Sequence, residues 1–277
     1  MMSKVAVASA CAALLLMGCS VVVDANRVQC NTDADCTARG SAFASATCVD
    51  SLCTASSKWA CLSSPPAASN AAGPFLVTMH VADLISHAPL PGVRADLCRK
   101  LDVACSDPAS TVTSDSTGTI SLQVEAAFSG YVWLQGDAIV PTLYFFNPTI
   151  DRDTDIPSLS MSTPAARGAL LGQLGADTAR ADILLDAWDC TGVTASAVDF
   201  SIAPASSDVI SYYLSSGLPT RGTGPTDSTG YGGFVNLTAG TVTVTATDTV
   251  SQQHISDLTL VVRPGTATWA RMVPNGG

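Results

Sequence analysis

Aspartate supplies almost all of the acidic side chains in this chain, and that imbalance limits the folds available to it. The sequence has 22 Asp but one Glu, Glu125, and ten Arg but only three Lys. Glu and Lys favour helices, whereas Asp competes with the helical backbone and favours turns. With 21 Gly and 15 Pro as well, the chain is predicted to be rich in turns and poor in helix.

Length and charge narrow the possibilities further. The 277 residues allow one large domain or two small ones. The formal net charge of -10 argues against nucleic acid as a partner, because such proteins need basic side chains to neutralise phosphates.

The N-terminus has the pattern of an export signal. Lys4 precedes an apolar stretch at 5–17, which is too short to span a bilayer but fits a signal peptide. The stretch ends in Leu-Met-Gly-Cys at 16–19, which resembles the bacterial lipobox. That resemblance implies removal of 1–18 and acylation of Cys19, and acyl chains hold a protein at a membrane. The alternative is an ordinary secretory signal cut elsewhere. Ser20 favours the outer membrane, on the surface or the periplasmic face.

The cysteines fit an exported protein with four disulfides. Cys11 leaves with the signal and Cys19 is lipidated, so an even number remains. The segment 30–53 has few large apolar residues, so crosslinks must replace a core there. A zinc site is the alternative, although the spacings are wider than zinc modules usually have. The disulfide candidates are Cys30, Cys36, Cys48, Cys53, Cys61, Cys98, Cys105 and Cys190.

Two pairings follow from spacing and elimination. Cys98 and Cys105 enclose six residues, and we expect a local bridge between them. Cys61 and Cys190 are then left over, which would tie the Cys-rich segment to the last domain.

Short apolar runs separated by turn residues predict two strand-rich blocks. Between them, 151–160 is polar, and Thr163-Pro164 begins one helix, with Ala166, Leu170 and Leu174 on its apolar face. The expected organisation is a Cys-rich stalk, a linker, a first sandwich, a connector with a short helix and a second sandwich, at 19–62, 63–73, 74–150, 151–176 and 177–275.

The two blocks repeat one another. Asp-Ser-Thr-Gly occurs at 115–118 and again at 227–230. Each copy lies shortly before a Gly that opens a strand, at Gly130 and Gly240. In each copy the Asp can accept hydrogen bonds from its own turn and the Gly can take a positive φ. The repetition predicts a duplicated fold.

These motifs resemble the carboxypeptidase regulatory-like domain, a transthyretin-like β-sandwich. The first block matches with Leu-Pro-Gly-Val at 90–93, the turn at 113–118 and Ser-Gly-Tyr at 129–131. The second block is a weaker match. The Cys-rich segment 30–53 before such domains and Asp-Cys-Thr-Gly at 189–192 also resemble Cys-rich surface lipoproteins of myxobacteria-like organisms, over about residues 19–275. The resemblance implies an all-β fold with tandem transthyretin-like or Ig-like β-sandwiches after a disulfide-rich N-terminal segment. It implies no peptidase activity.

No catalytic constellation emerges from the sequence. His80, His87 and His254 have no metal-binding spacing, and no serine nucleophile elbow or phosphate-binding loop occurs. We therefore expect a protein that is not an enzyme and that needs no cofactor.

Two further stretches of sequence have some features of a site. Asp151, Asp153 and Asp155 have the spacing of a calcium loop, but the Gly and Glu that such loops need are missing. We expect a solvated loop between domains there. The aromatic runs 144–146 and 212–213 could form a ligand platform, but core packing is expected.

The sequence thus favours a lipid-anchored cell-envelope protein with a structural or binding role. A protein or a glycan is the expected ligand. The alternative is an accessory module that supports a separate secreted or surface hydrolase.

Overall fold

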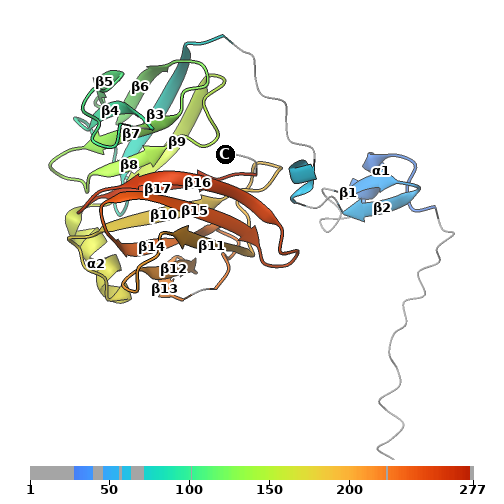
Figure 1. Ribbon diagram of the computed structural model, residues 1–277. Coiled ribbons are helices and arrows are strands. Elements are labelled where there is room, and N and C mark those ends of the chain that lie inside the picture. Colours follow the sequence, from blue (N-terminus) through green and yellow to red (C-terminus); the bar gives the residue numbers. More distant parts are fainter. Residues whose placement is uncertain are drawn as a thin grey trace, which may run out of the picture. The chain divides into compact units, whose positions relative to one another are not determined.

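The computed structural model describes residues 28–39, 46–55, 58–63, 72–100, 102–222 and 224–274. The chain divides into two compact units, Met1–Ser57 and Lys58–Gly277, whose main elements are labelled in Figure 1. The predicted signal at 1–18 and the predicted lipidation of Cys19 lie outside the described residues. No described helix has the length and apolar character needed to span a membrane.

The N-terminal unit is held together by disulfides. The helix α1 (Asp33–Thr37) is followed by a hairpin of β1 (Ala46–Val49) and β2 (Leu52–Ala55). Two disulfides, Cys30–Cys48 and Cys36–Cys53, cross this unit. Its buried cluster consists of Cys30, Cys36 and Ala46. Crosslinks therefore take the place of a hydrophobic core, as the sequence predicts.

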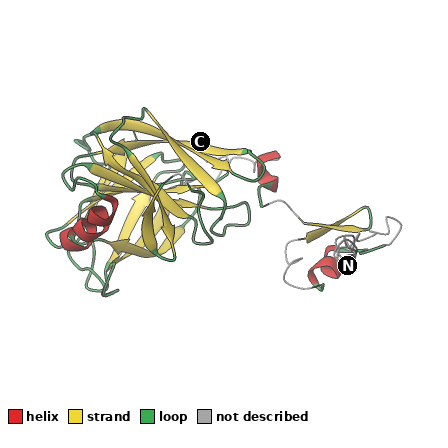
Figure 2. Ribbon diagram, turned by 90° about the horizontal axis from the view of Figure 1, so that it is seen from below, coloured by secondary structure: helices red, strands yellow, loops and turns green. Residues whose placement is uncertain are grey.

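The larger unit is almost entirely β, and Figure 2 shows how little of it is helical. All the strand-like runs of the sequence form strands, and the structure adds β9 and β13. The first sandwich consists of β3 (Phe75–Asp83), β4 (Arg94–Arg99), β5 (Ser110–Thr113), β6 (Thr119–Val124), β7 (Gly130–Gln135), β8 (Thr142–Phe145) and β9 (Thr154–Met161). The second consists of β10 (Ala181–Ala187), β11 (Val198–Ala203), β12 (Ile210–Ser215), β13 (Leu218–Arg221), β14 (Tyr231–Leu237), β15 (Gly240–Asp248), β16 (His254–Val262) and β17 (Ala267–Met272).

The two sandwiches share most of their strand pairing, which supports the predicted duplication. They differ at one strand, since β5 pairs with β4 whereas its counterpart β12 pairs with β14. In the first, β3 pairs antiparallel with β6 and parallel with β9. In the second, β10 pairs antiparallel with β14 and parallel with β17. The pairs β4–β7 and β7–β8 correspond likewise to β11–β15 and β15–β16.

The Asp-Ser-Thr-Gly turns occupy equivalent places in the two sandwiches. Asp115 accepts hydrogen bonds from the backbone and hydroxyl of Thr117, and Asp227 does the same with Thr229. A Cβ on Gly118 would lie 2.4 Å from the Val81 carbonyl oxygen in β3. The equivalent distance from Gly230, to a carbonyl oxygen of β10, is 2.7 Å. Each turn therefore needs glycine, for close approach as well as for its positive φ.

The sandwiches are not separate tandem domains, because they share a sheet. The last strand, β17, pairs parallel with β8 of the first sandwich and with β10 of the second. The result is one sheet in the order β13-β12-β14-β10-β17-β8-β7-β4-β5, and β8 and β17 lie side by side in Figure 1.

The two smaller sheets cover opposite faces of this long sheet. Tyr144 and Trp269 belong to the core beneath β6-β3-β9. Their chain neighbours Phe145 and Ala270 belong to the core beneath β11-β15-β16. Since neighbouring residues in a strand point to opposite faces, each sandwich uses a different face of the shared sheet.

The solvated loop expected at 151–155 is shorter than predicted, since a strand begins within it. Thr154–Met161 forms β9, which pairs with β3 at the edge of the first sandwich. Its polar residues are tolerated because burial along this strand is largely confined to Leu159 and Met161 at its end.

The predicted helix is present as α2 (Pro164–Leu174), capped by Thr163 and ended by Gly175 in the left-handed conformation. The prediction of its apolar face is right for Leu174 alone, since Ala166 and Leu170 are only half-buried. Arg167, Leu171 and Leu174 are the buried residues. A charged residue can face inward there because Arg167 pairs with Asp182 of β10.

Residues 58–62 belong to the larger unit and not to the stalk. Trp59 is 3% exposed and packs in the core of the second sandwich. Lys58 accepts a hydrogen bond from Cys190 through its carbonyl oxygen, and Cys61 forms a disulfide with Cys190. This pairing, and that of Cys98 with Cys105, agree with the pairings expected from the sequence.

Candidate functional site

A cleft of about 390 Å³ lies beside the strands that join the two sandwiches. We call it the aromatic cleft. It is lined by residues of β8, β9, β10, β14 and β17 and of the loop between β8 and β9: Tyr144, Phe146, Asn147, Pro148, Thr149, Ile150, Thr154, Asp155, Ile156, Pro157, Ser158, Asp186, Trp188, Tyr231, Trp269 and Arg271.

Strand register brings the key side chains onto one face of the shared sheet. Asp186 of β10 is paired with Arg271 of β17 on one side and with Tyr231 of β14 on the other. Trp269 of β17 is paired with Tyr144 of β8. Paired residues in adjacent strands point to the same face. Four neighbouring strands thus contribute to a single surface.

The buried carboxylate of Asp186 organises this surface. It is 3% exposed. It accepts a hydrogen bond from the indole Nε1 of Trp188 at 2.7 Å and one from that of Trp269 at 3.2 Å. It also pairs with the Arg271 guanidinium, whose Nε lies 3.1 Å away. One carboxylate therefore fixes two indole rings and a guanidinium, and a buried charge satisfied in this way is rigid.

The planar guanidinium of Arg271 also packs against the ring of Trp188. The centre of its guanidinium lies 3.7 Å from the centroid of the Trp188 ring, in a cation–π contact. The backbone carbonyl of Arg271 accepts a hydrogen bond of 2.7 Å from the Asn147 side chain, which fixes the loop after β8 against β17. The backbone N–H of Trp188 donates to the Met272 carbonyl, so that β10 and β17 stay joined beyond their last paired residues.

Burial governs the ionisation of the groups in the aromatic cleft. Burial raises the pKa of Asp186, and the charge of Arg271 and the hydrogen bonds from Arg271 and the two indoles oppose that rise. Burial also raises the pKa of Tyr144 to about 12 and raises that of Tyr231. The two phenols are therefore protonated near neutral pH and can act as hydrogen-bond donors.

The edge strand β9 forms the opposite wall of the aromatic cleft. It is the outer strand of the sheet β6-β3-β9. Thr154 and Ile156 are half-buried in the cleft wall, whereas Asp155, Pro157 and Ser158 are exposed. Asp155 lies 3.4 Å from Nε2 of His80. This wall supplies the hydroxyl oxygens of Thr154 and Ser158.

The three Asp residues with calcium-loop spacing are not brought together. Asp151 pairs with Arg152. Asp153 accepts a hydrogen bond from the backbone N–H of Leu76 at 2.8 Å, and Asp155 faces His80. Three carboxylates with three different partners do not form a cation site.

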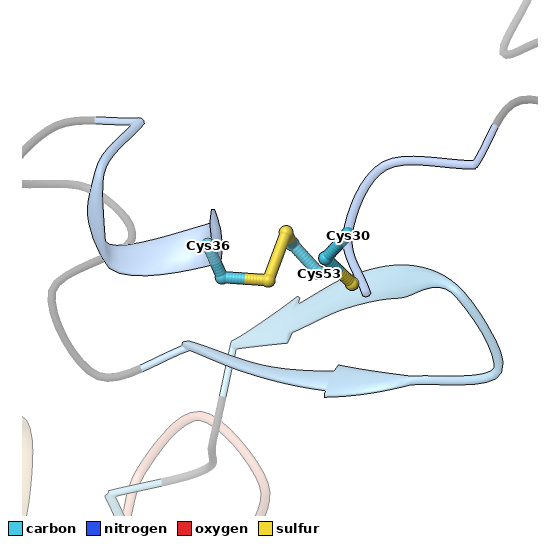
Figure 3. Close-up of side chains that lie close together, drawn as sticks. All are labelled: Cys30, Cys36 and Cys53. Carbon is cyan, nitrogen blue, oxygen red and sulfur yellow. A yellow bond between two sulfur atoms is a disulfide. The ribbon is translucent and has the colours of Figure 1, made fainter. Parts of the chain in front are cut away.

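Among the described residues, one group of potential metal ligands lies close together. It consists of Cys30, Cys36 and Cys53, whose sulfur atoms lie within 4.8 Å of one another (Figure 3). All three belong to disulfides, and a disulfide sulfur carries no thiolate charge with which to bind zinc.

The aromatic runs noted in the sequence are buried. Tyr212 donates to the carbonyl of Ile183, and Tyr213 donates to Asp199. Tyr144 and Phe146 form the floor of the aromatic cleft, and Phe145 faces the other core. The prediction of core packing is confirmed for these residues.

Sequence reasoning missed the residues that define the cleft. The missed residues form two patterns at the ends of β10 and β17, Asp-x-Trp at 186–188 and Trp-x-Arg at 269–271. Polar and aromatic residues at every second position mark one strand face as different from the other. This alternation is visible in the sequence, whereas the pairing of β10 with β17 is not.

No protein-family model matches the chain, and no curated protein sequence matches it. Several solved structures are similar at low scores. The TIE protein of Bacillus anthracis is 11% identical with a TM-score of 0.24, over 72% of this chain and 33% of its own. The chain therefore spans about a third of that protein.

Two pilins give comparable scores. The shaft pilin SpaA of Lactobacillus rhamnosus GG is 10% identical with a TM-score of 0.25, over 74% of this chain and 99% of its own. The minor pilin GBS52 of Streptococcus agalactiae is 12% identical with a TM-score of 0.24, over 73% and 98%. Scores of this size assign neither a family nor a function.

Proposed function

We propose that this protein is a non-catalytic, lipid-anchored component of the bacterial cell envelope that binds a ligand in the aromatic cleft. The observation that carries the proposal is the cleft itself. Rigidly held aromatic rings with a few polar groups around them are typical of binding sites. Its one buried carboxylate, Asp186, is occupied by an arginine and two indoles and is not arranged to act on a substrate.

The anchoring part of the proposal rests on the sequence. The export signal at 1–18 and the lipobox-like residues before Cys19 support acylation and an outer-membrane position. Disulfides in both units support an oxidising compartment. The shared strand topology of the sandwiches supports the likeness to carboxypeptidase regulatory-like domains and to Cys-rich surface lipoproteins.

A role as an accessory module for a separate hydrolase is the second candidate. It is supported by β9, whose outer edge has no partner strand within the described part of the chain. An open strand edge can pair with another protein.

Cell fractionation and envelope binding test the proposal. The full chain should fractionate with membranes, and Cys19→Ser should release it into the soluble fraction. The released Cys19→Ser protein should bind isolated envelope fragments, and Trp269→Ala should weaken that binding. Membrane association of Cys19→Ser would refute the lipid anchor. Undiminished envelope binding by Trp269→Ala would refute the role of the cleft.

A further inference from the structure

We infer that the aromatic cleft binds a neutral oligosaccharide. The inference rests on the proposed function, since it names the ligand class of that same site. The size of the cleft fits such a ligand. The volume of about 390 Å³ lies within the range of about 300–1,000 Å³ that small-molecule sites occupy, and one or two sugar rings are of that order.

The exposed rings suit the apolar faces of sugars. Trp188, Tyr231 and Trp269 line the cleft and are each partly exposed. A pyranose presents a face of C–H groups, which packs against the electron-rich face of an aromatic ring. Because Asp186 already fixes both indoles, little conformational entropy is lost when a ligand packs on them.

The polar groups suit hydroxyl groups, which both donate and accept hydrogen bonds. Within the described part of the chain, the terminal nitrogens of Arg271 have no hydrogen-bond partner, since its interaction with Asp186 uses Nε. They can donate to a ligand. The hydroxyl groups of Thr154 and Ser158 in β9 can accept. Donors on one wall and acceptors on the other match a polyhydroxylated ligand.

Charge favours a neutral sugar over an acidic one. The lining has one cationic side chain, Arg271, against Asp155 and Asp186. The chain as a whole has a net charge of -10, which repels anions at a distance. An extended peptide is disfavoured along the middle of β9, because Pro157 offers no backbone N–H to an added strand, and only the ends of this edge are left for pairing with another protein.

Asp186 acts as a positioning residue in this site. It is too deeply buried to contact a ligand directly, and it acts through the rings it holds. Asp186→Asn should therefore weaken sugar binding and shift the indole N–H resonances of Trp188 and Trp269. The corresponding resonances of Trp59 and Trp133, which lie elsewhere, should stay in place. A general loss of folded structure would shift all four indole resonances and not only those of Trp188 and Trp269.

Calorimetric titration with defined probes tests the inference. The soluble Cys19→Ser protein is titrated with cellohexaose, chitohexaose, maltohexaose and mannohexaose, and with oligogalacturonate as an acidic sugar. We expect binding of at least one neutral hexasaccharide. Trp269→Ala and Tyr231→Ala should each weaken it by about tenfold or more, and Trp133→Phe should leave it unchanged. Melting temperatures measured in parallel identify any variant that fails to fold.

The outcomes separate this inference from the proposed function. Binding of oligogalacturonate alone would overturn the neutral class. Suppose that no sugar binds, that binding to envelope fragments depends on the cleft, and that treating the fragments with protease abolishes this binding. That result would overturn the oligosaccharide as the ligand and keep the binding role of the cleft. If the protein bound neither envelope fragments nor any sugar, both this inference and the proposed binding function would be overturned.

Discussion

A single residue in each sandwich shows how the two halves have diverged. Gly92 and Ala197 stand before Val93 and Val198, at equivalent places in the two sandwiches. Their φ angles are 78° and 60°. Each donates its backbone N–H to the residue before the Asp turn, Ser114 or Thr226. Those two hydroxyl side chains in turn accept from the N–H of Val93 and Val198. The second sandwich therefore keeps the left-handed backbone conformation of the first, but with alanine, which is less suited to it than glycine.

Ala197→Gly should stabilise the protein. An alanine in the left-handed conformation costs the folded state about 1–2 kcal/mol. Glycine removes this cost, but its greater freedom in the unfolded chain offsets part of the gain. The free energy of unfolding, measured with denaturant, should rise by about 0.5 kcal/mol. The reverse change, Gly92→Ala, should lower it by about 1 kcal/mol, since no atom lies within 4 Å of the added Cβ to contribute a clash. Equal destabilisation by both changes would contradict this account.

The turn aspartates should have a defined response to acid. Hydrogen bonds from Thr117 and Thr119 lower the pKa of Asp115, and those from Thr229 lower the pKa of Asp227. A lowered folded-state pKa contributes stability that is present above the unfolded value of 3.8 and is lost as the pH falls through the folded value. Carboxyl-carbon NMR titration should place both midpoints below 3.8. Midpoints at or above that value would contradict the turn hydrogen bonds.

At the scale of elements, α2 depends on a buried ion pair. Arg167 donates to Asp182 from Nε at 2.6 Å and to the carbonyls of Thr178 and Arg180 at 2.8 Å each. Burial raises the pKa of Asp182 to about 6, and the charge of Arg167 opposes this rise. A raised folded-state pKa means that stability is lost as the pH rises through about 6.

Arg167→Met should lower the free energy of unfolding by about 3–5 kcal/mol at pH 8, because a buried carboxylate is left without its partner. The loss should be smaller at pH 5, where Asp182 can take up a proton. Arg152→Met removes an exposed pair with Asp151 and should change stability by less than about 1 kcal/mol. An equal loss at both pH values would show that Asp182 is not the cause.

The same elements show how far sequence can predict this fold. Alternation along strands such as β6 and β15 marks them clearly. In contrast, β9 and β13 are edge strands with one buried side or none, and they carry Pro157 and Pro219. Edge strands need little apolar surface, so their composition resembles that of a loop.

The aromatic cleft was beyond sequence reasoning for a different reason. Trp188 and Trp269 are 81 positions apart, and only the parallel register of β10 with β17 brings them onto one carboxylate. Parallel strands joined by long connections leave no local signal of their pairing. The hydrogen bonds of Asp115 and Asp227 lie within their own turns, whereas those of Asp186 depend on the pairing of β10 with β17.

At the scale of the whole molecule, the shared sheet should make the two sandwiches unfold together. The four tryptophans all lie in the larger unit, with Trp133 in the first sandwich and Trp59 in the core of the second. Tryptophan fluorescence therefore reports on this unit alone. Thermal unfolding should give a single transition whose calorimetric and van't Hoff enthalpies agree. Two resolved transitions would contradict a continuous sheet.

The Cys61–Cys190 disulfide should contribute more stability than the Cys98–Cys105 disulfide. It closes a sequence separation of 129 residues, against 7 for the other. Loop-closure entropy predicts about 5 kcal/mol for the long loop and about 2 kcal/mol for the short one. Replacing each pair by alanine and measuring unfolding in denaturant checks the order. A smaller loss for the long loop would contradict it.

The position of β17 in the chain has a consequence for how the protein matures. This strand is the last of the described elements, yet it separates β8 from β10 in the shared sheet. Until it is translated, the first sandwich has an open edge at β8 and the second has one at β10. The chain therefore cannot complete either half early, and a polypeptide cut short before Ala267 would expose two strand edges that are prone to aggregate.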